Sequence, residues 1–280
     1  MEIIKKIKNI KLEDILCLYI ILCPILDIAS FLFRNHFNTN ISISTFLRPI
    51  VPVVLAIYIF IRANKKNKLI LLGITALYVL YGVIHLIVTK TFLTGCSYGG
   101  IKEEMQYVIN YSFLIINLIV FYYAFINKKW RNKEIGSSDK NSKTNKLKLA
   151  VLIMCGIYIT SIYIAILTGT SSYTYIEEQI GYKGWIESGN SLSAILCIST
   201  FIILSLIKDK KYRIPAIIVL VLTGIYLVAL IGTRTGLLGF FLAVAVFIAI
   251  EVLFSKNKVA IVGFIILALA VITVGLVGSN

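Results

Sequence analysis

The residues best suited to chemistry form a short polar segment between two long apolar runs, Gly232-Thr233-Arg234-Thr235-Gly236. A guanidinium flanked by two hydroxyls suits a phosphate, because both kinds of group donate hydrogen bonds to its oxygens. A helix that starts near Gly236 would add free N–H groups and the positive end of its dipole. The segment therefore predicts a phosphate site at Arg234. The alternative is that Arg234 only reaches lipid headgroups at a helix end.

A second group of candidates lies in the segment 169–190, where aromatic side chains alternate with carboxylates. Tyr182 and Trp185 are among the aromatic residues. Aromatic faces with interspersed carboxylates suit a sugar, although tyrosine and tryptophan are also typical of the membrane interface. Asn190 ends this segment. We expect the run Ser188-Gly189-Asn190-Ser191 to cap the helix that follows, with Asn190 or Ser191 able to accept a hydrogen bond from its first turn.

A few polar residues fall inside or beside apolar runs. Asp27 and Arg48 lie in the outer halves of the first two runs. Since buried charges are normally paired, we expect them to form an ion pair rather than a catalytic site. His85 could serve as a base, but it has no identifiable orienting partner in the sequence and is predicted to be a hydrogen-bonded packing residue. Glu104 is expected at a solvated helix entry, so no catalytic residue is assigned.

Other kinds of site are missing from the sequence. It has no Cys or His pairs at the spacing of a metal site, no glycine-rich phosphate loop and no nucleophile elbow. These absences argue against a nucleotide-driven pump and against a zinc peptidase. We expect no metal and no cofactor.

The composition shows which elements must position these residues. The chain has 280 residues, of which 59% are hydrophobic and 15% are charged, and its mean hydropathy is +0.90. These values predict an all-α polytopic membrane protein with a single membrane domain and about nine transmembrane helices. The predicted spans are 14–33, 45–62, 69–89, 106–127, 149–168, 191–207, 214–232, 236–254 and 259–278.

The basic residues predict the orientation of these helices. The net charge of +15 could indicate nucleic-acid binding, but the basic residues cluster in short segments between apolar runs. With a cytoplasmic N-terminus, all but six of the 28 Lys and Arg residues lie on the inner side. The segment 128–148 becomes a cytoplasmic basic loop and 169–190 an outer loop. We therefore expect a lipid bilayer, and no nucleic acid, as partner. The six outer residues are Arg34, Arg48, Lys90, Lys102, Lys183 and Arg234.

Three segments, in this order, resemble the O-antigen ligase-related family of glycan ligases and polymerases. The first is Pro24-Ile25-Leu26-Asp27 together with 43–49. The second is 181–194, with its Gly-Trp and Asn residues before an apolar run, and the third is 232–236. The resemblance implies a metal-independent glycosyltransferase in the bacterial cytoplasmic membrane. Such an enzyme transfers a glycan from undecaprenyl pyrophosphate to an acceptor hydroxyl on the outer face, in the synthesis of cell-surface polysaccharide such as wall or capsule.

The resemblance also implies roles for residues. Arg234 matches the family's motif arginine and is expected to hold the pyrophosphate, and Arg48 is a second candidate. We expect Trp185, Asn190 and Tyr182 to contact the glycan. The family's histidine-bearing outer loop follows the span equivalent to 259–278, and no histidine follows His85 here. The catalytic base is therefore unassigned, and an inactive truncated member is one alternative.

Two other classes of protein stay open. A flippase of lipid-linked saccharide would carry polar residues through both halves of the membrane, whereas here they gather in the outer half. A membrane scaffold would have no cavity at Arg234.

Overall fold

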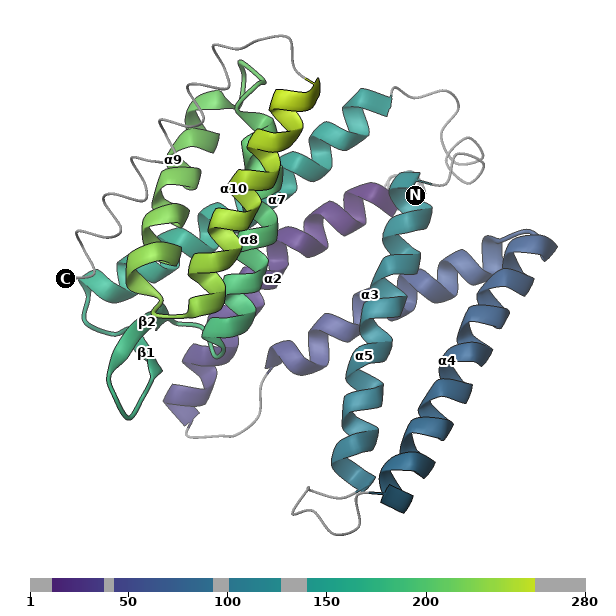
Figure 1. Cartoon of the computed structure of the whole chain (residues 1–280). Coiled ribbons are helices and arrows are strands. Elements are labelled where there is room, and N and C mark those ends of the chain that lie inside the picture. Colours follow the sequence, from purple (N-terminus) through teal and green to yellow (C-terminus); the bar gives the residue numbers. More distant parts are fainter. Residues whose placement is uncertain (1–11, 38–42, 93–100, 127–139, 255–280) are drawn as a thin grey trace, which may run out of the picture. The chain divides into compact units, whose positions relative to one another are not determined.

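The protein is described by a computed structural model, which places residues 12–37, 43–92, 101–126 and 140–254 (Figure 1). The chain divides into two compact units. The first unit consists of Met1–Leu16 and Thr45–Lys143, and the second of Cys17–Ser44 and Thr144–Asn280. The predicted span 259–278 and most of the predicted loop 128–148 lie outside the described residues.

The first unit is built around a pair of antiparallel helices. It contains most of α3 (Ile43–Arg62), then α4 (Lys65–Phe92), α5 (Ile101–Phe121) and the π-helical turn η1 (Tyr122–Ile126). The Tyr78 hydroxyl in α4 donates to the Val108 carbonyl in α5. Further along α4, His85 bonds Glu104, which lies earlier in α5 than Val108. These pairings run in opposite directions along the two helices, which lie side by side in Figure 1.

The second unit contains most of α2 (Leu12–Phe37) and the C-terminal helices. These are α7 (Lys140–Leu167), α8 (Gly189–Leu206), α9 (Arg213–Ile225), the π-helical turn η2 (Tyr226–Leu230) and α10 (Arg234–Phe254). Helices α8 and α10 pack closely, because a Cβ added at Gly239 would lie 2.7 Å from the Cys197 sulfur. Tyr158, Tyr226 and Phe240 are the largest fully buried side chains, and the Tyr158 hydroxyl donates to Asp27 at 2.7 Å.

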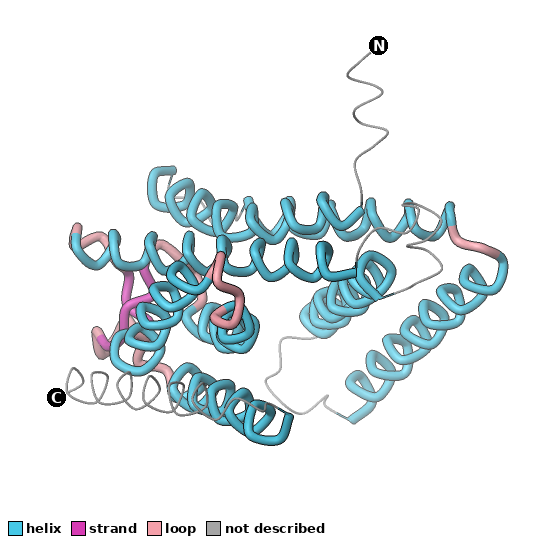
Figure 2. The backbone as a smooth tube through the Cα atoms, turned by 90° about the horizontal axis from the view of Figure 1, so that it is seen from above, coloured by secondary structure: helices cyan, strands magenta, loops and turns pink. Residues whose placement is uncertain are grey.

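A β-hairpin connects α7 to α8 and lies at the end where α8 begins (Figure 1), and its strands are magenta in Figure 2. Strand β1 (Ser172–Tyr175) pairs antiparallel with β2 (Ile180–Gly184), and Tyr173 lies opposite Tyr182. The turn between them uses a positive φ of 53° at Gln179. The predicted loop 169–190 is therefore ordered by a hairpin, a small addition to an otherwise helical structure.

The helices confirm a polytopic helical membrane protein. Among the described residues, six helices are long and apolar enough to cross a membrane: Leu12–Phe37, Lys65–Lys90, Glu104–Phe125, Asn145–Leu167, Gly189–Leu206 and Arg213–Leu230. A shorter apolar helix covers Arg234–Ile250, and α3 carries Pro49 and Pro52 within it. These eight helices correspond to the first eight predicted spans. The count of nine and the cytoplasmic N-terminus stay predictions.

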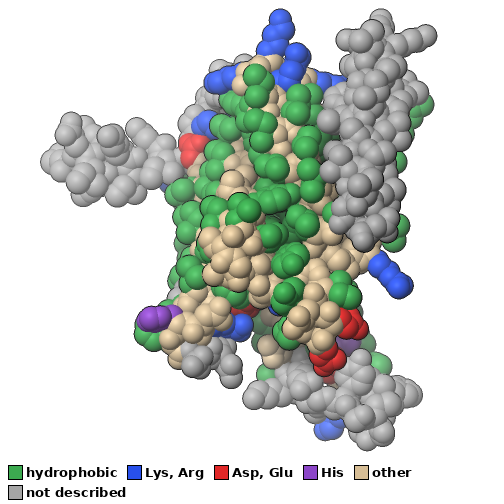
Figure 3. All heavy atoms as spheres, turned by 90° about the vertical axis from the view of Figure 1, so that its left-hand side faces the viewer, with side chains coloured by type: hydrophobic (Ala, Val, Ile, Leu, Met, Phe, Trp, Pro, Cys, Tyr) green, Lys and Arg blue, Asp and Glu red, His purple; other side chains and the backbone are tan. Residues whose placement is uncertain are grey.

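The second unit also shows a separation of side-chain types along its helices. Figure 3 shows hydrophobic side chains over the middle of the helices, a group of Lys and Arg side chains at one end, and other charged side chains toward the opposite end. In sequence, the connection from α8 to α9 carries Lys208, Lys210 and Lys211, and Arg213 begins α9. Helix α8 starts at the hairpin and ends at this basic connection, so the hairpin and the basic connection lie at opposite ends of α8.

Candidate functional site

The site is built on the start of α10, at the turn that follows η2. Gly232 has a positive φ of 70°, which an L side chain rarely adopts, and it turns the chain into the new helix. Thr233 then caps the helix: the Gly236 N–H donates to the Thr233 hydroxyl at 3.2 Å. Arg234 and Thr235 occupy the first helical positions, where N–H groups have no acceptor inside the helix.

A chain of buried hydrogen bonds fixes this cap against α8. The Ser193 hydroxyl donates to the Gly189 carbonyl at 2.8 Å and lies 2.8 Å from the Thr233 hydroxyl. Because the Ser193 hydrogen is committed to Gly189, Thr233 donates to Ser193 and keeps its lone pairs for the Gly236 N–H. Both side chains are buried, and both are satisfied. The position of Arg234 is therefore set by packing between two helices.

The hairpin docks on the same turn through two glycines. A Cβ added at Gly181, in β2, would lie 2.1 Å from the Ile231 carbonyl oxygen, and one at Gly232 would lie 3.2 Å from the Gly181 Cα. Gly181 also has a positive φ of 71°. Only glycine fits this approach, so the backbone of β2 rests directly on the turn before Arg234.

The other strand of the hairpin rests on the start of α8. A Cβ added at Gly189 would lie 2.8 Å from the Thr174 side chain in β1. The cap of α8 is Ser188, whose hydroxyl accepts from the Ser191 N–H at 3.3 Å. The predicted capping run 188–191 does cap the helix, but the accepting oxygen belongs to Ser188 and not to Asn190 or Ser191. Because Ser188 takes that role, the Asn190 amide is not used as the cap.

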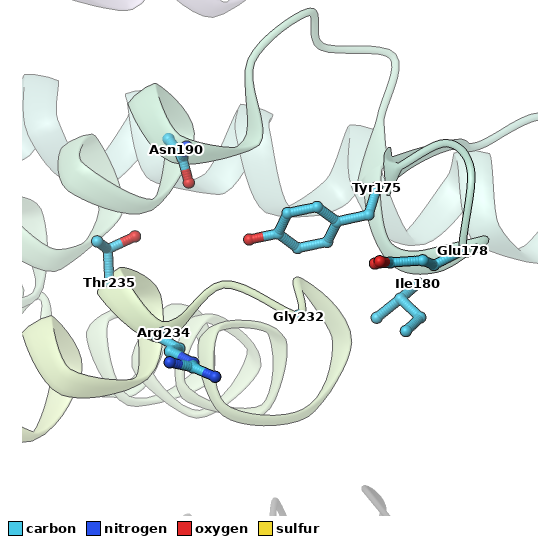
Figure 4. A pocket seen from close by; sticks show the side chains of 7 residues that line it. All are labelled: Tyr175, Glu178, Ile180, Asn190, Gly232, Arg234 and Thr235. Atoms are coloured by element: carbon cyan, nitrogen blue, oxygen red, sulfur yellow. The ribbon is translucent and has the colours of Figure 1, made fainter.

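These contacts create an open pocket of about 500 Å³, a size typical of small-molecule sites. The residues that line it come from the hairpin, α8 and the α10 turn: Tyr175, Glu178, Ile180, Asn190, Gly232, Arg234 and Thr235. Figure 4 shows the Tyr175 hydroxyl pointing toward the side where Asn190 and Thr235 lie. The pocket thus gathers a guanidinium, a carboxylate, a phenol, an amide and a hydroxyl.

The charges of the pocket are available to a ligand. Arg234 and Glu178 are both exposed, and within the described part of the chain neither forms an ion pair. Glu178 lies on the hairpin side and Arg234 on the α10 side (Figure 4). The helix dipole adds positive potential on the Arg234 side. This side is therefore the positive side of the pocket, and pyrophosphate binding by Arg234 stays a prediction.

The comparison with family models agrees with the geometry. The model of the O-antigen ligase like membrane proteins matches residues 9–279. The chain belongs to this family. No curated protein and no solved structure matches the chain in the two other comparisons.

In this O-antigen ligase-like protein, two predicted site residues, Arg234 and Asn190, line the pocket. Tyr182 and Trp185 are not among the lining residues. The Tyr182 ring packs on Tyr173 with centroids 5.4 Å apart, and the Trp185 N–H donates to Thr170 at 2.9 Å. Their contact with a glycan stays a prediction.

Arg48 belongs to the first unit, in α3, whereas the pocket belongs to the second. Its role in pyrophosphate binding and its pairing with Asp27 both stay predictions. In the second unit, Asp27 accepts a hydrogen bond from Tyr158.

Sequence reasoning missed Tyr175 and Glu178 as individual site residues. Both lie in the segment 169–190, and aromatic residues with carboxylates were the general signal there. The two residues are distinguished only by the hairpin, whose turn begins directly after Tyr175 and contains Glu178.

The prediction for Glu104 is wrong. Its side chain is buried rather than solvated, and it pairs with His85 at 2.9 Å, with the Tyr81 ring stacked on the imidazole. His85 therefore has an orienting partner, which the sequence did not reveal because the partner lies on the next helix. Among the described residues, no group of three or more His, Cys, Asp or Glu is arranged to hold a metal.

Proposed function

We propose that this O-antigen ligase-like protein transfers a glycan from undecaprenyl pyrophosphate to an acceptor hydroxyl on the outer face of the bacterial cytoplasmic membrane. The observation that carries the proposal is the pocket at the start of α10. There Thr235 and Arg234, which forms no ion pair within the described part of the chain, line the pocket at the first turn of a helix.

The reaction explains why an arginine belongs there. The acceptor oxygen forms a bond to the anomeric carbon of the glycan, and the bond from that carbon to the pyrophosphate oxygen breaks. The leaving pyrophosphate gains negative charge as this happens, so a fixed guanidinium stabilises the transition state more than the ground state. The acceptor hydroxyl gives up its proton, and we assign no residue of this chain as the base that takes it.

A binding titration tests the proposal. Purified protein in detergent is titrated with undecaprenyl pyrophosphate, and Arg234→Gln is compared with the native chain. The loss of a charge-assisted contact, worth about 1.5–3 kcal/mol, should weaken binding roughly tenfold or more.

The matched control is Arg213→Gln. Arg213 is also an exposed arginine at the first position of a helix. It begins α9, at the end of that helix away from η2 and the pocket, and its Nε donates to the Ile207 carbonyl. The control should bind like the native protein. If Arg234→Gln and the native chain bind the carrier equally well, Arg234 only anchors the helix at the membrane interface.

A further inference from the structure

The pocket differs in charge between its two sides, and this difference carries an inference about the substrate. The α10 side presents Arg234 and Thr235, and the hairpin side presents Tyr175 and Glu178. A site built only for a pyrophosphate would exclude a carboxylate, because like charges repel strongly where solvent is partly displaced. Glu178 must therefore face a different part of the ligand.

The chemistry of the hairpin side identifies that part. An ionised carboxylate only accepts hydrogen bonds, so it favours a neighbour that donates them. The Asn190 amide both donates and accepts, and the Tyr175 side chain offers an aromatic ring and a phenol. A ring with several hydroxyls and apolar C–H faces matches this combination. In a lipid-linked glycan, such a ring is attached directly to the pyrophosphate.

We propose that Glu178, with Tyr175 and Asn190, forms a subsite for the sugar that is bonded directly to the carrier pyrophosphate. This inference rests on the proposed function, since it places the pyrophosphate at Arg234. It assigns the sugar to the turn of the hairpin rather than to Tyr182 and Trp185, neither of which lines the pocket. The Glu178 carboxylate also makes the subsite unfavourable for a sugar that is itself acidic.

The hairpin offers a matched pair for the test. Glu177 and Glu178 are consecutive, exposed carboxylates in the same turn, but only Glu178 lines the pocket. Glu178→Gln keeps the size of the side chain and removes its charge, and Glu177→Gln makes the same chemical change outside the pocket. Neither substitution should alter the thermal unfolding midpoint, since both side chains are solvated.

The experiment measures the affinity of each variant for undecaprenyl pyrophosphate alone and for the same carrier with one galactose or one N-acetylglucosamine. We expect the native protein to prefer at least one sugar-bearing carrier over the bare carrier. Glu178→Gln should reduce that preference about fivefold to tenfold, while affinity for the bare carrier stays equal or rises. Glu177→Gln should leave the preference unchanged.

A second readout uses a carrier with galacturonic acid. The native protein should bind it more weakly than the galactose carrier, and Glu178→Gln should narrow that difference. The subsite is overturned if the native protein shows no sugar preference, or if both glutamine variants retain the native preference. Arg234→Gln distinguishes failure of the subsite from failure of the proposed function. This substitution should weaken the binding of all the carriers equally. If it does not, the pyrophosphate site itself is overturned.

Discussion

Two pairs of ionisable residues in this protein differ in whether they contact each other. In the first unit, His85 and Glu104 meet at 2.9 Å between α4 and α5 and satisfy each other. In the second unit, Arg234 and Glu178 line one pocket, and no ion pair between them is formed. A charge that is already paired holds structure, whereas a charge held at a pocket wall without a partner is available to a ligand.

The helices that carry these two pairs also differ in how densely they are packed. In the most apolar stretch of α8 half of the residues are buried, whereas in the corresponding stretch of α4 only 11% are buried. Dense packing around α8 fixes the turn before Arg234 through Thr233, Ser193 and Gly181. A binding site needs this support, because a positioned guanidinium is effective only when its backbone is held in place.

The largest effect is expected from a Cβ at the contact between the hairpin and the α10 turn. In Gly181→Ala the new atom would lie 2.1 Å from the Ile231 carbonyl, at a positive φ. The hairpin must shift away, so we expect a loss of roughly 2–4 kcal/mol in unfolding free energy together with loss of carrier binding. Thermal unfolding in detergent and the carrier titration measure the two effects.

The control for this substitution is Gly169→Ala. Gly169 has a similar φ of 67°, but a Cβ there would meet nothing within 4 Å. Gly169→Ala should lower the free energy of unfolding by only about 1 kcal/mol and leave carrier binding unchanged. Equal effects at the two glycines would mean that backbone strain alone, and not docking of the hairpin, accounts for the loss.

An intermediate effect is expected at the cap of α10. Thr233→Val removes the hydroxyl that accepts from Gly236 and donates to Ser193. We expect a loss of about 1–2 kcal/mol in stability, and weaker carrier binding because the first turn of α10 frays.

Thr235→Val provides the comparison, since it removes an exposed hydroxyl two residues away. It should leave the unfolding midpoint unchanged and weaken carrier binding only slightly. If Thr233→Val proves as stable as Thr235→Val, the network does not position Arg234.

The smallest effect is expected in the first unit. A double-mutant cycle of His85→Gln and Glu104→Gln should give a coupling energy of about 0.5–1.5 kcal/mol, since both groups are polar but His85 is partly exposed. Neither substitution should change affinity for the carrier. A strong loss of carrier binding would show that this pair takes part in function and would remove the contrast between the two regions.

The sequence was sufficient for the helices and for the most distinctive residue of the site. Long apolar runs identify membrane helices directly, and Arg234 stands out because a basic residue on the outer side needs a reason. The hairpin was missed because its strands have only four and five residues, too short for a clear alternation of side chains.

The rest of the site depends on contacts between distant segments. Glu178 reaches the pocket because Gly181 rests on Gly232, 51 residues further along the chain, and no local pattern reveals that contact. Glu104 faces His85 because of the way α4 and α5 pair, which hydropathy alone does not specify.

The most direct test of the central claim is a crystal structure of the protein in a lipid mesophase with undecaprenyl pyrophosphate bound. We expect the pyrophosphate oxygens about 3 Å from the Arg234 guanidinium and from the N–H groups of Arg234 and Thr235. A pyrophosphate bound outside the pocket, with Arg234 facing lipid, would contradict the account.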